Sequence, residues 1–370
     1  MIKKKLIFYI PSFENGGAER VASVLLNYWI ENDIFLPFVI NTIPEEFDFF
    51  EIDSSISRTF LEYDYKKKGT LANITERLKR CLLLRKTLRE RSEDLVISFL
   101  TTPSLLLLVS SIGLKKKVIC CEHSNYYLYG NKYSRAVRNL LYFFLADQIT
   151  LLTARDIDNY PAYLREKITV VPNPLGIDGS NYNCTVGSSL NKQNVTNLLF
   201  VGRLVEVKGI KRLCKILKDI KDDAWHLTIC GDGPLRGFLE NFLFKNRLSN
   251  KVRLTGSVKN IEKYYCDSDL LVMTSLQEGL PMVIAEAMSF NLPVIAFDCP
   301  TGPREFISHN INGLLIEDNN YESYVNQLRF LIHNRNELKR LADNTQKSIE
   351  SYRVSNINKT WKDLINKVYT

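Results

Sequence analysis

Two glutamates with seven residues between them, Glu278 and Glu286, form the strongest chemical signal in the sequence. The apolar run LLVMTS before them predicts a strand, and a helix is expected to begin near Pro281, because proline is favoured at the first helical position. The N–H groups of Gly279 and Leu280 would then lie at a helix N-terminus, which attracts anions. We therefore expect Glu278 in a ligand-binding loop and Glu286 within reach of ribose hydroxyls.

Two cations, Arg203 and Lys208, follow the predicted strand LLFVG and precede a predicted helix. Arginine can bind phosphate oxygens through two N–H groups, and lysine adds a point charge, so the pair suits a diphosphate leaving group. Two solvated surface cations are the alternative, and the spacing alone favours that simpler interpretation.

A glycine pair, Gly16 and Gly17, lies where the predicted strand LIFYI turns into a helix with apolar residues at Val21, Val24 and Leu25. Glycine lets backbone N–H groups approach an anion at the positive end of a helix. A plain glycine turn is an equally good interpretation of this motif.

Elements that position these residues can be predicted from apolar runs that alternate with amphipathic, helix-length segments. The runs interpreted as strands are 6–10, 95–100, 117–121, 148–152, 168–171, 198–202, 226–231, 252–256, 270–275 and 293–297. Strands alternating with helices predict parallel sheets, in which ligands bind at the carboxyl ends of the strands. The expected fold class is α/β, with two Rossmann-like, doubly wound domains facing a central cleft.

The domain boundary is predicted from a stretch rich in Ser, Asn and Gly, residues 179–197, which we interpret as a linker. It would separate a first domain at 1–178 from a second at 198–353. The tail at 354–370 has a helical apolar period and is expected to pack back on the first domain.

Composition excludes several classes of protein. With 370 residues, 45% of them hydrophobic, the chain has enough apolar mass for two ordinary cores, so it is neither disordered nor collagenous. The net charge of +8 favours an anionic partner. Eight cysteines without a C-x-x-C pair are expected to be reduced thiols.

Two segments raise the question of a membrane. Residues 95–114 carry no charge and are long enough for a span, but Pro103 divides the run into a strand and a helix, so no span is expected. The segment 71–91 is a strongly basic predicted helix, interpreted equally well as a surface helix or as a contact with anionic lipid or a lipid diphosphate. Its apolar stripe comprises Leu71, Ile74, Leu78, Cys81, Leu84 and Leu88.

Six motifs occur in one order along nearly the whole chain: GGAER, VGRLVEVKG, ICGDGPLR, LTGSVKN, EGLPMVIAEAM and CPTGPREFI followed by NGLLI. Together they resemble the retaining nucleotide-sugar glycosyltransferases of family four, which have two Rossmann-like domains in the GT-B arrangement. The resemblance includes members that act in bacterial surface-polysaccharide assembly, such as O-antigen or capsule.

The resemblance implies roles for the residues of the second domain. Arg203 and Lys208 would hold the donor diphosphate, and Glu286 would bind the ribose. Glu278 would bind sugar hydroxyls, beside the backbone of 279–281. Arg203, Lys208, Glu278 and, in the other domain, His123 would act in catalysis.

Other positions follow from the same resemblance. Gly17, with Gly16 beside it, would approach a phosphate oxygen, and Val258 would contact the base. His123, in CCEHSN, matches a histidine near the transferred sugar, and Asn173 falls where the family often has an asparagine close to the donor, although a turn role suits it as well. Arg304 and Glu305 in GPREF receive no individual role.

Metal ligation is not expected. Asp267-Ser268-Asp269 has the D-x-D pattern of a cation site, but it lies before the predicted strand LLVMTS rather than after it. Arg203 and Lys208 already supply positive charge for phosphates, and four scattered histidines without paired cysteines leave little for zinc.

The resulting expectation is a cytoplasmic, retaining, metal-independent hexosyltransferase without a bound cofactor, peripheral at the inner face of the cell membrane. It would move a sugar from a nucleotide-sugar, with a UDP-sugar as the preferred donor, to a glycan acceptor linked to polyprenyl diphosphate. It would bind no nucleic acid. The alternatives are a nucleotide-sugar epimerase or phosphorylase of the same fold, and a non-catalytic protein that binds polyanions or membranes.

Overall fold

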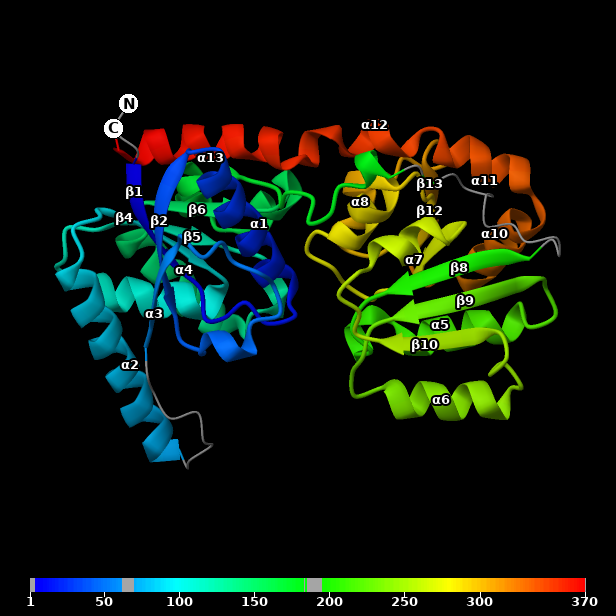
Figure 1. Cartoon of the computed structure of the whole chain (residues 1–370). Helices are drawn as coiled ribbons and strands as arrows, with labels where there is room; N and C mark the ends of the chain where they lie inside the picture. Colours follow the sequence, from blue (N-terminus) through cyan, green and yellow to red (C-terminus); the bar gives the residue numbers. More distant parts are fainter. Residues whose placement is uncertain (1–3, 62–69, 183, 185–194, 370) are drawn as a thin grey trace. The chain divides into compact units, whose positions relative to one another are not determined.

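The computed structural model describes residues 4–61, 70–182, 184 and 195–369. The chain divides into two compact units (Figure 1). Unit 1 comprises residues 1–174 and 354–370, and unit 2 comprises residues 175–353. Each unit is built on its own parallel sheet, so the expectation of two α/β domains is confirmed.

Unit 1 contains a seven-stranded sheet in the order β3-β2-β1-β4-β5-β6-β7, with every neighbouring pair parallel. The strands are β1 (Lys4–Tyr9), β2 (Phe35–Asn41), β3 (Ser57–Phe60), β4 (Leu95–Phe99), β5 (Lys117–Cys121), β6 (Gln148–Leu151) and β7 (Ile168–Val170). The strand order reverses between β1 and β4. The loops that follow these two strands are therefore where a doubly wound sheet usually binds its ligand.

Helices cover both faces of this sheet. They are α1 (Gly17–Glu31), α2 (Thr70–Glu90), α3 (Thr101–Ser111), α4 (Lys132–Leu145) and α13 (Val354–Tyr369). One apolar core joins the sheet to α1 and α13, and a second joins it to α2, α3 and α4. The strands are consequently buried on both sides, which explains their nearly continuous apolar sequences.

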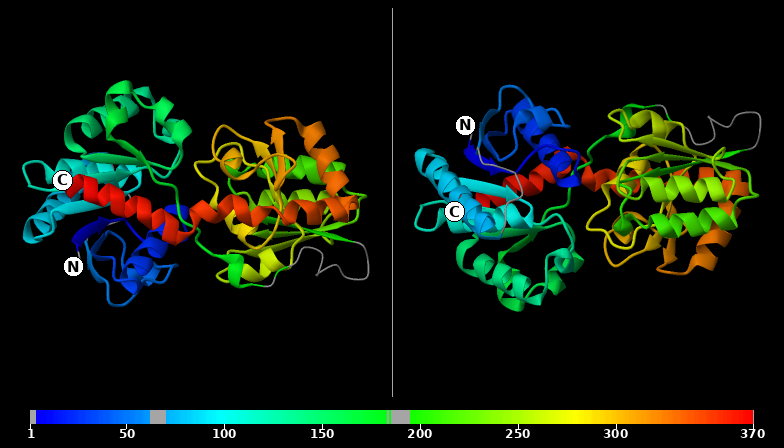
Figure 2. Two further views of the ribbon diagram at one scale, coloured as in Figure 1. Left: turned by 90° about the horizontal axis from the view of Figure 1, so that it is seen from above. Right: turned by 90° about the horizontal axis from the view of Figure 1, so that it is seen from below.

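The C-terminal helix α13 lies beside α1 in unit 1 (Figures 1 and 2). The rings of Trp29 and Trp361 meet edge to face with centroids 5.9 Å apart. The indole N–H of Trp29 donates to Oδ1 of Asn358 at 3.0 Å, so a large buried ring keeps its polar atom satisfied. The last residues of the chain thus complete the core of the first unit.

The basic helix α2 is only partly a surface element. Leu84 and Leu88 are fully buried in the core, whereas Leu78 is exposed. The side chains of Leu71 and Ile74 lie outside the described residues. Nη1 of Arg85 donates to the carbonyls of Ser110 and Ile112 at the end of α3, so this cation is committed to the fold.

The apolar stretch at 95–114 forms β4 and α3 on either side of Leu100. The expected division into a strand and a helix is confirmed, but it falls at Leu100, and Pro103 lies in the first turn of α3. Within the described ranges, no helix combines the length and the apolar character that crossing a bilayer requires.

Unit 2 contains a six-stranded parallel sheet in the order β10-β9-β8-β11-β12-β13. Its strands are β8 (Thr196–Val201), β9 (Trp225–Cys230), β10 (Val252–Gly256), β11 (Leu270–Met273), β12 (Val294–Asp298) and β13 (Gly313–Glu317). Its helices are α5 (Ile210–Asp219), α6 (Arg236–Lys245), α7 (Glu262–Cys266), α8 (Met282–Ser289), α9 (Pro303–Phe306), α10 (Tyr321–His333), α11 (Arg335–Ala342) and α12 (Thr345–Ile349). The strand order reverses between β8 and β11.

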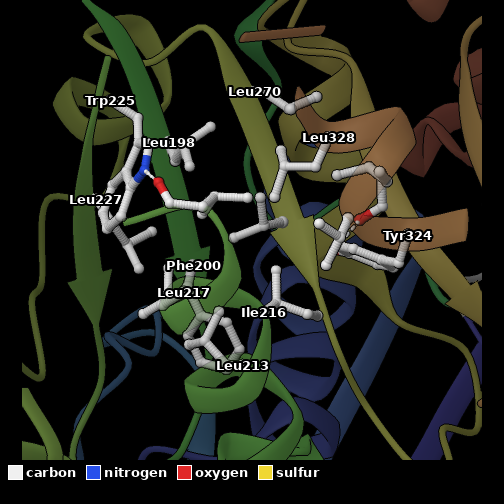
Figure 3. Close-up of a cluster of buried hydrophobic side chains, with 14 of the residues drawn as sticks. Leu198, Phe200, Leu213, Ile216, Leu217, Trp225, Leu227, Leu270, Tyr324 and Leu328 are labelled. Carbon is white, nitrogen blue, oxygen red and sulfur yellow. Dashed lines mark hydrogen bonds between the residues drawn. The ribbon is translucent and has the colours of Figure 1, made fainter. Parts of the chain in front are cut away.

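The core of unit 2 lies between its sheet and the helices α5 and α10, as Figure 3 shows. Trp225 on β9 is 1% exposed, and its indole N–H donates to the carbonyl of Ile220 at 2.6 Å. On the α10 side, the hydroxyl of Tyr324 donates to the carbonyl of Ile295 at 3.1 Å. These bonds let two large amphipathic rings fill the core without a polar penalty.

The boundary between the units differs from the expected linker at 179–197. Unit 2 begins at Leu175, and Gly179 already packs in it, with its N–H donating to Oγ of Ser289 at 2.9 Å. Residues 183 and 185–194 lie outside the described residues. Cys184 forms a disulfide with Cys266, so the expectation that all eight cysteines are free thiols is wrong for this pair. The two cysteines are 82 residues apart in the sequence, so their spacing gave no indication that they pair.

Candidate active site

Lys208 and Glu278 come together at the point where the strand order of unit 2 reverses. Lys208 ends a short 3₁₀ helix (η6, Glu206–Lys208) that follows β8, and Glu278 follows β11. The lysine Nζ donates to Oε1 of Glu278 at 2.7 Å and to Oε2 at 2.9 Å. Their side chains remain 24% and 10% exposed. One of the three lysine hydrogens is therefore left to reach a ligand from the solvent side.

A left-handed glycine fixes the position of Lys208. Gly209 has φ +70°, and a Cβ at this residue would lie 1.8 Å from the carbonyl oxygen of Thr274. The Thr274 hydroxyl donates to the carbonyl of Gly209 at 3.1 Å. Only glycine fits this close approach, which locks the loop after β8 against the end of β11.

Side chains not identified from the sequence orient Glu278. Ser275 Oγ donates to Oε1 of Glu278 at 2.6 Å, and the hydroxyl of Thr301 donates to the Glu278 carbonyl. Ser275 ends the run LLVMTS, which the alternation of apolar residues marks only as strand. The only indication in the sequence that Ser275 contacts Glu278 is that it lies three residues before it.

The buried Arg212 on α5 holds the segment that contains Ser275 and Glu278. Its Nη1 donates to the carbonyl of Ser275 at 3.2 Å and to Oδ1 of Asp318 at 2.6 Å. Its Nη2 donates to Oδ1 of Asn319 at 2.7 Å. A buried guanidinium with three partners of this kind holds its neighbours in a single geometry.

The turn from Gly279 to Pro281 leads into α8. Pro281 caps this helix, so the helix begins one residue later than expected, at Met282. Glu286 is 3% exposed, and the hydroxyl of Tyr265 donates to its Oε2 at 3.0 Å. Glu278 therefore lies in the loop before α8, whereas Glu286 is buried on the helix itself.

Arg203 and Val258 lie in the loops that follow β8 and β10. The Arg203 side chain is exposed, and Val258 is half-buried. Gly302, with φ +98°, brings the loop after β12 against Pro281. These loops, together with the one after β11, place the predicted residues of unit 2 at the carboxyl end of one sheet.

In unit 1, the glycine pair lies after β1, beside the point where that strand order reverses. Gly16 caps α1, and Gly17 is its first residue. A Cβ at Gly17 would meet no atom within 4 Å, so no packing within the chain requires glycine there. At Gly16, a Cβ would collide with the flexible carboxylate of Glu19.

His123 lies just after β5 in the same unit. Its ring packs on Phe99, with centroids 4.2 Å apart. Both ring nitrogens are shielded from solvent and lack a well-aligned hydrogen bond within the described ranges. Burial lowers the pKa of His123 to about 4, and the side chain of Asn173 opposes this shift in part. The imidazole is therefore neutral near pH 7.

The remaining predicted residues have structural partners. Arg304 forms an ion pair with Asp298 at the end of β12. Asn173 is 7% exposed and belongs to unit 1, next to His123. Glu305 follows in α9 and, with burial, contributes to raising the pKa of Tyr352 to about 12.

The D-x-D segment lies at the other end of the unit 2 sheet. Asp269 precedes β11, where its carboxylate accepts a bond from the backbone N–H of Asn197 at 2.8 Å. Asp267 and Ser268 line a cavity of about 240 Å³ beside β8, β9 and β10. Among the residues that the structure describes, no three His, Cys, Asp or Glu side chains gather as metal ligands.

Comparisons with known proteins agree with this arrangement. The family model for glycosyl transferases group 1 matches residues 187–348. The amylovoran biosynthesis glycosyltransferase AmsD of Erwinia amylovora is 31% identical over 372 residues, covering 98% of this chain and 99% of the relative.

A second relative comes from Campylobacter jejuni. It is the GalNAc-α-(1→4)-GalNAc-α-(1→3)-diNAcBac-PP-undecaprenol α-1,4-N-acetyl-D-galactosaminyltransferase, 29% identical over 369 residues, covering 98% of this chain and 99% of the relative. Among solved structures, Anabaena HepE in complex with UDP and glucose has a TM-score of 0.82 at 19% identity, covering 98% of this chain and 99% of that one. At this identity the structural likeness shows the GT-B fold alone.

Three findings point to one conclusion. AmsD is more than 30% identical to this chain over 99% of its length, a family model matches most of the second unit, and the two parallel α/β units have the GT-B fold. The chain belongs to the family of glycosyl transferases group 1 and is a glycosyltransferase.

Proposed function

We propose that this glycosyltransferase transfers a sugar from a UDP-sugar to a lipid-linked glycan, with retention of anomeric configuration, in bacterial surface-polysaccharide or glycan assembly. The observation that carries the proposal is the Lys208–Glu278 pair at the carboxyl ends of β8 and β11. It joins a phosphate-binding cation to a carboxylate suited to sugar hydroxyls at the usual ligand position of such a sheet.

The donor would be held by unit 2. Arg203 and the third hydrogen of Lys208 would bind the diphosphate, and the exposure of Arg203 leaves its guanidinium accessible for this. Glu286 would bind the ribose, Val258 the base, and the backbone N–H groups at 279–280 the sugar. HepE, whose structure contains UDP and glucose, supports a uridine nucleotide as the donor.

Unit 1 would contribute two groups. Gly17 offers a backbone approach to a phosphate oxygen because no side chain fills the space above it. His123 would offer a neutral imidazole to a hydroxyl near the transferred sugar, since its buried nitrogens have no well-aligned hydrogen-bond partner among the described residues. A desolvated group of this kind is a common sign of a functional site.

Displacement would occur at the anomeric carbon, with the acceptor hydroxyl attacking from the face on which the diphosphate leaves. The bond from the anomeric carbon to the diphosphate breaks, a bond to the acceptor oxygen forms, and the proton of the acceptor hydroxyl passes to an oxygen of the departing diphosphate. Lys208 and Arg203 would stabilise the negative charge on the departing diphosphate, a preorganised electrostatic effect that usually dominates catalysis. We propose that this charge, rather than a metal ion, completes the site.

The acceptor is proposed to be linked to a polyprenyl diphosphate. The name of the Campylobacter relative, with its PP-undecaprenol acceptor, supports this linkage. The name of AmsD, an amylovoran biosynthesis enzyme, supports a role in polysaccharide assembly.

A panel of nucleotide-sugars tests the donor by protection of the chain against thermal unfolding, since a selective ligand stabilises the native state by mass action. The preferred donor is then incubated with a polyprenyl-diphosphate glycan, and the configuration of the new linkage is determined by NMR. We expect an α-linked product from an α-linked donor. Inversion, or turnover of the donor without any acceptor, would contradict the proposal and indicate a different chemistry on the same fold.

A further inference from the structure

Helix α4 buries two polar side chains and exposes four large apolar ones, while Tyr142, Leu141 and Leu145 pack against the core. On the inner side, Arg138 and Asn139 are only 0% and 3% exposed. Large apolar residues lie on the outer side, spaced so that they share one helical face: Tyr133 is 69% exposed, Val137 58%, Leu140 55% and Phe144 69%. A surface helix of a water-soluble protein normally has the opposite orientation.

Specific partners fix this orientation. The guanidinium of Arg138 lies over the ring of Tyr126 at 4.4 Å and over the ring of Tyr160 at 5.1 Å. Nδ2 of Asn139 donates to the Tyr126 hydroxyl at 2.9 Å, and the hydroxyl of Tyr142 donates to the buried carboxylate of Glu122. If α4 were rotated about its axis to bury the apolar stripe, Arg138, Asn139 and Tyr142 would lose these partners, and a buried polar group without a partner costs free energy. The apolar face is therefore a stable feature of the outer surface.

The apolar face continues onto the neighbouring 3₁₀ helix (η4, Ala162–Lys167). Phe143 meets Tyr163 edge to face with centroids 5.3 Å apart, and Tyr163 is itself 52% exposed. Nζ of Lys167 donates to the carbonyls of Phe143 and Ala146, each at 2.7 Å, which caps the end of α4. We call the set Tyr133, Val137, Leu140, Phe143, Phe144 and Tyr163 the α4 patch.

Positive charge accompanies the α4 patch. The sequence of α4 contains Lys132, Arg135 and the buried Arg138 but no acidic residue. The Lys132 ammonium lies 5.2 Å from the ring of Tyr133. In η4, two cations accompany one acid, Glu166. Two lysines therefore lie beside rings of the α4 patch, Lys132 near Tyr133 and Lys167 with its ammonium 5.8 Å from the Phe143 ring.

We propose that the α4 patch docks on a lipid bilayer that contains anionic lipid. An apolar helix face with tyrosines and cations at its edges is typical of helices that lie in the plane of the membrane interface. Basic residues beside such a face are attracted to anionic headgroups, in keeping with the chain's net charge of +8. A protein interface is disfavoured as the occupant, because lysine is depleted at protein–protein interfaces.

The docking surface consists of residues of α4 and η4 alone. Its use, which is to bring unit 1 to an acceptor held in the bilayer, rests on the proposed function. It also shifts the expected membrane contact from the basic helix α2 to α4, since α2 buries Leu84 and Leu88 in the core and uses Arg85 to hold α3.

Co-sedimentation of the full chain with phosphatidylcholine vesicles, with and without phosphatidylglycerol, tests the proposal. The test variant carries Val137→Gln, Leu140→Gln and Phe144→Gln. Partition onto vesicles with phosphatidylglycerol should fall at least about tenfold, because three apolar side chains no longer enter the interface. A matched control changes three exposed apolar residues of unit 2, Phe244→Gln, Ile311→Gln and Phe330→Gln, and should bind like the wild type.

A second variant, Lys132→Gln with Arg135→Gln, should lose only the part of binding that depends on phosphatidylglycerol and on low salt. Should the triple variant fail to fold by circular dichroism, the single change Phe144→Glu replaces it, with the same expected loss of binding. Equal partition of wild type and variant, or no binding by the wild type, would overturn the proposal. So would a wild-type dimer that the triple variant disperses in sedimentation velocity, because the patch would then be a self-interface.

Transfer to a water-soluble acceptor analogue separates this proposal from the proposed function. The triple variant should retain that transfer while losing vesicle binding. If the wild type bound vesicles through the α4 patch but transferred no sugar to any acceptor, the result would support the docking surface and contradict the proposed function.

Discussion

Lys208 and Glu278, separated by 70 residues in the chain, form an ion pair at 2.7 Å where β8 and β11 end side by side. Both carboxylate oxygens accept from the same ammonium, and Ser275 donates to one of them. The pair is therefore oriented before any donor arrives, and such preorganisation is what makes electrostatic stabilisation effective in catalysis.

Removing either phosphate-binding cation should reduce turnover strongly. For Lys208→Ala and Arg203→Ala we expect a loss of about 2.7 to 4 kcal/mol of transition-state stabilisation each, or roughly a hundred- to a thousandfold in kcat. Lys211→Ala is the matched control, since Lys211 is an exposed cation three residues away that pairs with Glu206 at 2.8 Å. Steady-state kinetics with thermal melts of each variant provide the measurement. Near-normal kcat in both test variants would exclude the phosphate role.

Gly17→Ala should weaken donor binding without weakening the fold. The new methyl group meets no atom of the chain within 4 Å, and alanine is favoured over glycine in a helix by up to about 1 kcal/mol. Gly237→Ala is a matched control, because Gly237 is the second residue of helix α6 and also has open space at its Cβ. UDP protection against thermal unfolding should decrease only for Gly17→Ala. Equal protection of both variants would mean that no ligand approaches Gly17.

Gly209→Ala should instead destabilise unit 2. The alanine Cβ would lie 1.8 Å from the carbonyl of Thr274, and φ of +70° costs a non-glycine residue about 1 to 2 kcal/mol before any clash. Urea unfolding should give a lower free energy of unfolding than the wild type by more than that amount. A variant as stable as the wild type would show that the loop after β8 can move away from β11.

His123 should make stability depend on pH. Its pKa is lowered by burial from 6.5 to about 4, so between these values the unfolded chain binds a proton that the folded chain does not. Stability therefore decreases as the pH falls from 6.5 to 4, by on the order of 3 kcal/mol from this residue, and is unaffected above pH 7. His123→Gln should flatten this part of the curve in urea unfolding. Parallel pH curves for His123→Gln and wild type would contradict the assigned pKa.

Activity should survive an excess of chelator. Asp269 is engaged by the backbone of Asn197 at the amino end of β11, away from the Lys208–Glu278 pair. The initial rate is measured with EDTA, followed by addition of Mg²⁺ or Mn²⁺. Loss of activity with EDTA and its recovery with metal would assign a cation to the site and refute the metal-independent proposal.

Much of the fold could be predicted because buried parallel strands leave continuous apolar runs in the sequence. All ten runs interpreted as strands are strands in the structure, but β2, β3 and β13 were not identified. β2, with the sequence FLPFVIN, is apolar but contains Pro37, which argues against a strand in the sequence. β3 is a short strand at the sheet edge with the polar sequence SRTF and has no apolar run. At β13, Gly313 and Glu317 leave only the three apolar residues LLI between them.

The sequence by itself determined which residues are capable of the chemistry. Arg203, Lys208 and Glu278 follow strands that can be located from apolar runs, and Glu286 lies on the helix predicted after Glu278. Only the tertiary structure decided which of them meet. The contact between Lys208 and Glu278 requires β8 and β11 to be neighbours, and strand order is set by the packing of the whole sheet rather than by either segment. The outward apolar face of α4 also depends on the fold, because helical periodicity gives two faces, and the burial of Arg138 among tyrosine rings selects the one that turns inward.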